Sequence, residues 1–176
     1  LKSTALAKTQ KHGRKKMKFR LLTILAISLM TISAFISGTE AADRYGKQKV
    51  VYHVNYDNPK AQAGALRNIQ NHINAVGAEN LELRVVLHGK GLTLLLEPDQ
   101  AQYTKLEVGN ATDKMAAMIS GLKDQGVAFN VCANTVRGKK IDIDANLFDV
   151  SEADIVPSGV AELAHLQAQG FTYIKP

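Results

Sequence analysis

Short runs of apolar residues alternate along the chain with longer stretches in which apolar residues recur every three or four positions. Runs rich in Val, Ile and Leu are typical of strands, and stripes at helical spacing that end at Gly are typical of helices. The first pattern predicts strands over residues 49–54, 83–87, 127–132, 155–156 and 171–174. The second predicts helices over 59–76, from 113 to 126, within 141–148 and from 160 to 170. The pattern does not decide the structure of the apolar run at 92–96.

The first of these helices has the clearest boundaries. Asn58 is a favourable N-cap, Pro59 suits the first helical position, and Gly77 suits the end. One apolar stripe connects them, formed by Leu66, Ile69, Ile73 and Val76. We predict in the same way that Asp113 caps the next helix, which Gly126 closes.

Alternation of strands and helices predicts an α/β fold with a mainly parallel sheet of about five strands between two helical layers. The strand at 127–132 is apolar at nearly every position, which is typical of a strand covered on both faces. In such sheets ligands bind beyond the carboxyl ends of the strands. The residues that follow each strand are therefore the place to search for chemistry.

The N-terminal segment resembles an export signal. Residues 15–20 carry four Lys or Arg, residues 21–36 are apolar and uncharged, and small residues then lead to Ala41. We predict cleavage after Ala41, a periplasmic location and no stable membrane insertion after cleavage. The alternative is an uncleaved anchor, although a span requires about 20 apolar residues. We predict that translation starts at Met17 and that residues 1–16 are an over-extended gene model, which leaves 42–176 as the folded domain.

Composition narrows the function classes. The formal net charge is +6, but residues 1–41 hold eight Lys or Arg and one Asp or Glu, whereas residues 42–176 hold 14 and 15. The domain itself is therefore nearly neutral, which argues against nucleic acid as a partner. The chain has one cysteine, so an internal disulfide and a multi-cysteine metal or iron–sulfur site are excluded.

Three blocks in order resemble the DsrE/DsrF-like (YchN-like) family: residues 51–57, residues 126–135 (GVAFNVCANT), and residues 155–160 with 170–176. The resemblance implies a small three-layer α/β sandwich that assembles as a homotrimer or larger homo-oligomer. In the sulfur-metabolism members, it implies a persulfide carried on a cysteine and passed between proteins, without metal or organic cofactor. Those members work in the cytoplasm as hetero-oligomers, whereas this chain carries a predicted export signal, and many close relatives have no established activity.

Cys132 and His88 are the predicted catalytic residues. A thiolate is the sulfur nucleophile, so a carrier cysteine needs partial exposure and a positive or hydrogen-bonding environment. His88, in the sequence His-Gly-Lys-Gly after the second strand, is a candidate base or cation for that thiol. The alternatives are a buried cysteine that acts as a small hydrophobic residue and an ordinary loop histidine.

Further residues at strand ends are predicted to bind ligands: Asp57, Gly89, Asn134, Ser158 and Gly159. Gly89 would let a ligand approach the backbone, and the Ser158–Gly159 helix start offers free N–H groups to an anion, unless Ser158 is simply an N-cap.

The remaining histidines do not predict a metal site. His53 is interpreted as a core histidine, and with His72 and His88 it lacks the spacing of a zinc site, so we predict no metal.

The predicted function is sulfur relay through Cys132 with a protein or small-molecule sulfur donor and acceptor. The alternative is a non-catalytic oligomeric binding or scaffold protein in which Cys132 is packed. In either case we predict that the apolar run at 92–96 supplies contact surface between copies of the chain.

Overall fold

Five parallel strands form the centre of the computed structural model, which describes residues 44–176. They are β1 (Gln48–Val54), β2 (Leu81–Leu87), β3 (Ala128–Cys132), β4 (Ile155–Val156) and β5 (Thr172–Ile174). Their order is β4-β3-β2-β1-β5, and every pair is parallel. The predicted parallel α/β sheet is confirmed. The predicted leader, its cleavage site and the start at Met17 lie outside the described residues.

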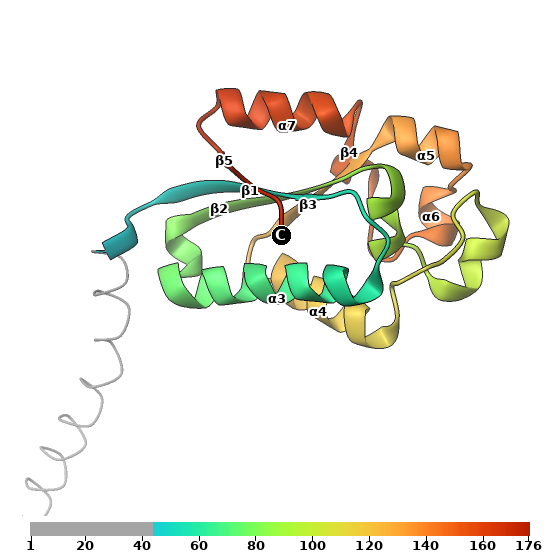
Figure 1. The fold of residues 1–176 in the computed structure, drawn as a ribbon, viewed down its shortest axis with the longest axis horizontal. Coiled ribbons are helices and arrows are strands. Elements are labelled where there is room, and N and C mark those ends of the chain that lie inside the picture. Colours follow the sequence, from blue (N-terminus) through green and yellow to red (C-terminus); the bar gives the residue numbers. More distant parts are fainter. Residues whose placement is uncertain (1–43) are drawn as a thin grey trace, which may run out of the picture. The chain divides into compact units, whose positions relative to one another are not determined.

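Helices cover both faces of the sheet, so the predicted three-layer architecture is confirmed. Figure 1 shows α3 (Pro59–Val76) and α4 (Asp113–Lys123) below the sheet and α7 (Gly159–Ala168) above it. The first four strands are placed side by side in chain order, and α7 then returns the chain to the far side of β1, where β5 pairs. This return brings the C-terminal strand beside β1, more than a hundred residues earlier in the sequence.

The two faces of the sheet bury very different amounts of apolar surface. The face toward α3 and α4 holds the larger core, with fully buried side chains such as Leu66, Ile69 and Phe129. The face toward α7 holds a small cluster of Val51, Val86, Leu163, Leu166 and Phe171. Because one helix covers this second face, Ala128 and Asn130 of β3 are only half-buried. β3 is covered on both faces, as its apolar sequence predicts, but less completely on the side of α7.

The helix boundaries follow local capping chemistry. The side chain of Asn58 accepts a hydrogen bond from the backbone N–H of Ala61 at 2.9 Å, as predicted for the start of α3. Thr112, one residue before the predicted cap Asp113, accepts from the N–H of Met115 at 3.4 Å and starts α4. A hydroxyl and a carboxylate are comparable caps, so adjacent candidates are not distinguished by sequence.

The apolar run at 92–96 lies in the interior. It belongs to the 3-10 helix η2 (Gly89–Leu94) and the residues after it, and Leu92, Leu94, Leu95 and Leu96 are each 0% exposed. These side chains pack in the larger core, so the prediction that they form contact surface between copies is wrong.

Short helices occupy the loops between the strands and the longer helices and complete the described part of the chain. They are α5 (Ala133–Lys139), α6 (Ile143–Asn146), η1 (Ala78–Asn80), η3 (Pro98–Tyr103) and η4 (Glu152–Asp154). The helix predicted within 141–148 is α6, whereas α5 was not predicted.

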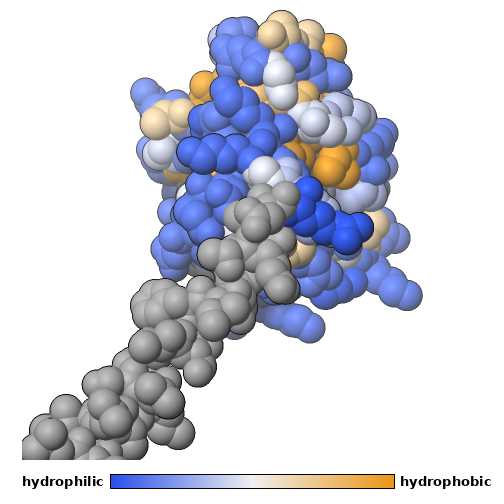
Figure 2. All heavy atoms as spheres, turned by 90° about the vertical axis from the view of Figure 1, so that its left-hand side faces the viewer, coloured by the Kyte–Doolittle hydropathy of each residue, from blue (hydrophilic) through white to orange (hydrophobic). Residues whose placement is uncertain are grey.

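The two edges of the sheet differ in chemistry. The edge where the strands begin presents a mainly hydrophilic surface (Figure 2). The cysteine and a pair of histidines, described below, lie toward the opposite edge, at or near the ends of β1, β2 and β3. Within residues 44–176 no helix has both the length and the apolar character required to cross a bilayer.

Candidate functional site

Cys132 is the last residue of β3 and directly precedes α5. Its extended backbone (φ −72°, ψ 112°) places it at the N-cap position of that helix. The residue is 4% exposed, so the partial exposure expected of a carrier cysteine is not found in the single chain.

Hydrogen-bond donors surround the Cys132 sulfur. Burial raises the pKa of the Cys132 thiol, but hydrogen bonding from the Gly159 N–H, from the hydroxyl and N–H of Thr135, and from the Asn134 N–H lowers it. The donors outweigh burial, and the resulting pKa lies below the ordinary value for cysteine. Sequence analysis anticipated this kind of environment but not the presence of α5, which supplies most of the donors.

Gly159 brings the start of α7 close to the ends of β2 and β3. A Cβ atom placed on Gly159 would lie 3.0 Å from the Cβ of His88 and 3.3 Å from the Cβ of Cys132. A larger side chain would force both residues outward. The close approach lets the Gly159 N–H act on the sulfur and places His88 and Cys132 side by side.

His88 is half-buried at the end of β2 and is hydrogen-bonded to a second histidine. Its Nε2 lies 2.7 Å from the Nε2 of His53, so one of the two nitrogens donates and the other accepts. Burial lowers the pKa of His88, and the charge of Lys175 lowers it further. His88 is therefore a neutral base near pH 7, and the cation considered from sequence is disfavoured.

His53 is 7% exposed, as expected of a core histidine, and both of its ring nitrogens have partners. Its Nδ1 lies 2.7 Å from the phenol oxygen of Tyr173 on β5. Burial, then the charge on His88 and the charge on Lys175, lower the pKa of His53 to about 4. His53 thus connects His88 with the edge strand, a connection that sequence analysis missed.

Three other predicted residues have defined positions around this group. The Gly89 N–H donates to the hydroxyl of Thr135 at 2.8 Å and is thus occupied by the protein itself. The Asn134 side chain is exposed and accepts from Arg137, while its N–H acts on Cys132. Ser158 accepts from the Ala161 N–H at 3.4 Å and is the N-cap of α7.

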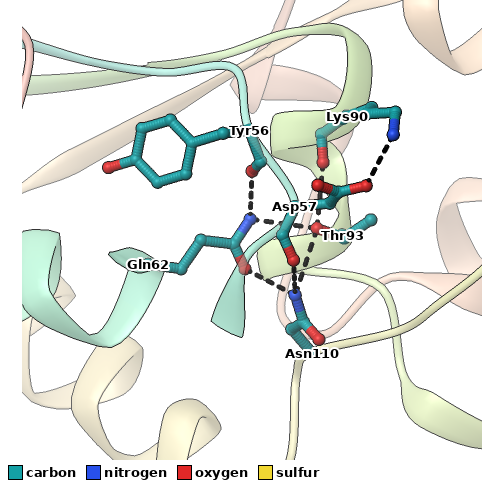
Figure 3. A network of polar contacts seen from close by, with 6 residues as sticks. All are labelled: Tyr56, Asp57, Gln62, Lys90, Thr93 and Asn110. Atoms are coloured by element: carbon teal, nitrogen blue, oxygen red, sulfur yellow. Dashed lines mark hydrogen bonds and ion pairs between the residues drawn. The ribbon is translucent and has the colours of Figure 1, made fainter. Parts of the chain in front are cut away.

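Asp57 belongs to a different polar cluster, shown in Figure 3. Its carboxylate pairs with Lys90 at 2.9 Å, and its backbone oxygen accepts from the Asn110 side chain at 2.8 Å. Asn110 also donates to Gln62, and Gln62 donates to Thr93 at 2.9 Å. We call Gln62, Thr93 and Asn110 the amide network. It fixes the loops after β1 and β2, and in the described residues no hydrogen bond or ion pair joins it to Cys132.

Three residues of these clusters were not predicted from the sequence, and they differ in whether the sequence contains a signal for them. Gln62 falls on the same helical stripe as Leu66 and Ile69, so its burial was detectable from spacing. Thr135 was visible within the family motif, but its role depends on α5. Tyr173 has no signal, because it meets His53 only through pairing of β5 with β1.

The histidines do not converge on a metal position. His72 lies on α3 and bonds instead to Tyr52 at 3.0 Å and Gln48 at 2.9 Å. In the described part of the chain no three His, Cys, Asp or Glu side chains are arranged to hold an ion.

Comparison with known proteins gives one family and one structural relative of note. The model of the DsrE/DsrF-like family matches residues 48–176, from β1 to the C-terminus. The chain is also similar to MTH1491 from Methanobacterium thermoautotrophicum, a solved structure of a protein of unknown function. The identity is 28% and the TM-score 0.57, over 74% of this chain and 100% of that one. No curated protein matches the chain.

Proposed function

This chain belongs to the DsrE/DsrF-like family, which is associated with sulfur relay, and we propose that it carries sulfur as a persulfide on Cys132. The observation that carries the proposal is the position of Cys132, at the N-cap of α5 and against Gly159 at the start of α7. Three N–H groups and one hydroxyl lower the pKa of a thiol that burial alone would raise. A cysteine that served only as a small hydrophobic residue would not need four donors.

The proposed reaction transfers one sulfur atom. The Cys132 thiolate attacks the outer sulfur of a donor persulfide, R–S–SH, so a new S–S bond forms on Cys132 and the S–S bond of the donor breaks. R–S⁻ leaves, and Cys132 becomes Cys–S–SH. An acceptor thiolate then attacks the outer sulfur and restores the Cys132 thiolate. Neither step requires an external oxidant or reductant.

Burial of Cys132 is the observation that the competing packed-cysteine function expects. Carriage requires a path to the sulfur, and His88 is the half-buried side chain adjacent to it. We propose that this path opens beside the His88 ring, which keeps its hydrogen bond to His53. The two functions then differ in a measurable way, because an openable site reacts in the native state and a packed one does not.

The test is mass spectrometry of native protein treated with a polysulfide or a small alkyl persulfide. We expect the mass of one added sulfur, lost on treatment with a reducing thiol and absent in Cys132→Ser. The chain has one cysteine, so no other thiol confuses the result. Modification of Cys132 only in denaturant would reject the carrier function in favour of the packed cysteine.

We also propose that the chain works outside the cytoplasm, after cleavage behind Ala41. The support is the order of basic, apolar and small residues in the leader. N-terminal sequencing of the exported protein should read Ala-Asp-Arg-Tyr. A membrane-bound form that starts at Met17 would contradict this.

We propose in addition that the domain assembles as a homotrimer or larger oligomer, a proposal supported by the family alone. The 92–96 run is buried, so the contact must use other residues. Light scattering on residues 42–176 should give at least three copies, and a monomer across micromolar concentrations would contradict it.

A further inference from the structure

Three side chains form a continuous hydrogen-bonded chain from the edge of the sheet to the neighbourhood of Cys132. Tyr173 on β5 bonds to His53 Nδ1 at 2.7 Å, and His53 Nε2 bonds to His88 Nε2 at 2.7 Å. Exposure changes along this chain: Tyr173 is 40% exposed, His53 is 7% exposed and His88 is half-buried. The chain therefore links solvent at β5 with an interior position beside the cysteine.

His88, at the interior end of this hydrogen-bonded series, has one nitrogen available for a ligand. His88 Nε2 is used by His53, whereas His88 Nδ1 makes no hydrogen bond to any residue of the described part. The position that a Cβ atom on Gly159 would occupy lies 3.0 Å from the Cβ of His88 and 3.3 Å from the Cβ of Cys132. The same position is 3.3 Å from His88 Cδ2, so the His88 ring lies beside the Cys132 side chain, which an attached sulfur would lengthen by one atom.

Two arrangements of protons keep Tyr173, His53 and His88 neutral and form both hydrogen bonds between them. In the first, His88 Nε2–H donates to His53 Nε2, His53 Nδ1–H donates to the Tyr173 oxygen, and His88 Nδ1 has no proton. In the second, the Tyr173 hydroxyl donates to His53, His53 Nε2–H donates to His88, and His88 Nδ1 carries the proton. Passage from the first to the second takes up a proton at His88 Nδ1 and releases the Tyr173 hydroxyl proton to water.

The surroundings favour these neutral forms over an imidazolium. Burial is the main cause that lowers the pKa of both histidines, and the charge of Lys175, which follows β5, acts on both in the same direction. The pKa of His53 falls to about 4, so a proton is not stored on it near pH 7. The nearby Cys132 is the other titratable group, and its pKa is lowered by its own donors.

We propose that Tyr173, His53 and His88 form a proton relay that removes the proton of the sulfur newly attached to Cys132 and releases a proton to solvent at β5. This inference rests on the proposed function. As the outer sulfur passes from the donor to Cys132, His88 Nδ1 takes its S–H proton, so the product is Cys–S–S⁻, and one proton leaves from Tyr173. R–S⁻ departs as the thiolate and is protonated by water. His88 is a catalytic residue in this scheme, and His53 and Tyr173 act through it.

The decisive variant is Tyr173→Phe, with Tyr52→Phe as its matched control. Both remove a phenol that bonds to a histidine, but Tyr52 bonds to His72, away from Cys132. We expect Tyr173→Phe to slow sulfur loading from an alkyl persulfide at least about tenfold at neutral pH, below the full effect of a general base. Tyr52→Phe should load at the wild-type rate. Alkylation of Cys132 by iodoacetamide removes no proton from bound sulfur, so both variants should retain its wild-type rate.

A solvent deuterium isotope effect separates relay from mere support of His53. Several protons move together in the relay, so a plot of the wild-type loading rate against the deuterium fraction of the solvent should be curved. The same plot for Tyr173→Phe should be straight. Equal loading rates and isotope effects in wild type and Tyr173→Phe would overturn the relay. Equal slowing in Tyr173→Phe and Tyr52→Phe would overturn it too.

The unloaded protein tests the relay even if no sulfur is carried. Nitrogen-15 spectra of the imidazoles should show one protonated nitrogen on each of His53 and His88 at neutral pH and a proton shared between the two Nε2 atoms. A doubly protonated ring at that pH would overturn the relay. Absence of a sulfur adduct on wild-type Cys132 together with the expected nitrogen spectra would instead reject the proposed function and keep the hydrogen-bonded chain.

Discussion

Two polar clusters lie at the carboxyl edge of the sheet, and they differ in whether their hydrogen bonds are completed within the protein. In the amide network, Gln62, Thr93 and Asn110 are 0%, 1% and 7% exposed and bond to one another and to backbone oxygens. The group of Cys132, His53, His88 and Tyr173 is equally well ordered. However, His88 Nδ1 makes no hydrogen bond within the described residues, and the groups that act on Cys132 are directed at a reactive thiol.

This difference separates a structural role from a chemical one. Buried polar groups that satisfy each other stabilise one loop conformation, and removal of any member leaves the others unpaired. A cluster with donors directed at a nucleophile and an open acceptor beside it is arranged to change its protonation state. Variants in the first cluster should therefore alter stability, and variants in the second should alter reactivity or pH dependence.

The largest expected effect is a loss of stability in acid that belongs to the second cluster. The pKa of His53 is about 4 in the folded protein and 6.5 ordinarily, so between these values the unfolded chain binds a proton that the folded chain does not. Stability is therefore complete above about pH 6.5 and falls as the pH drops to 4, by about 3 kcal/mol from this one group.

Urea unfolding at several pH values measures this effect. His53→Gln, which cannot titrate, should show a shallower decline between pH 6.5 and 4 than wild type, whatever its stability at pH 7. Parallel declines in the two proteins would contradict the assignment to His53.

The next effect belongs to the amide network. Asn110→Ala removes the donor to the buried Gln62 Oε1 and to the part-buried backbone oxygen of Asp57. We expect a loss of about 2 kcal/mol in the free energy of unfolding. Asn71→Ala, at an exposed position on α3, is the control and should change stability by no more than about 0.5 kcal/mol. Alkylation of native Cys132 should be unchanged in both, and a faster rate in Asn110→Ala would show that the clusters are coupled.

A smaller effect is expected where α7 meets the cysteine. In Gly159→Ala the new Cβ would lie 3.0 Å from His88 and 3.3 Å from Cys132, so both must shift by a few tenths of an ångström. We expect a loss of about 1 kcal/mol, because the contact is overpacked. Gly121→Ala, within α4 and with nothing within 4 Å, should instead gain about 0.5 to 1 kcal/mol from helix propensity. Calorimetry of the two variants gives the comparison, and a gain in both would show that the Gly159 contact is slack.

The smallest effect concerns the thiol itself. Thr135→Val removes a hydroxyl that lowers the pKa of Cys132, so less thiolate is present at neutral pH. We expect alkylation at pH 7 to slow about threefold, because less of the thiol is ionised. Thr135→Ser keeps the hydroxyl and should restore the wild-type rate. An unchanged rate in Thr135→Val would mean that the N–H groups alone set the pKa.

The sequence by itself determined the elements and the layers of this protein. Runs rich in Val, Ile and Leu and apolar stripes of period 3.6 report which residues face a core, and caps such as Asn58 are local. β1, α3 and α7 were therefore predictable to within a residue or two. The motif around Cys132 and the glycines after β2 identified the residues to examine, but not their exposure.

Tertiary structure alone decided how those residues combine. The approach of Gly159 to Cys132 depends on how α7 packs on the sheet, and the bond from Tyr173 to His53 depends on β5 pairing with β1 across 120 residues of chain. The burial of the 92–96 run likewise depends on which elements cover it. Local patterns record the free energy of single elements, whereas these contacts arise from the global arrangement in which elements distant in sequence bury their surfaces together.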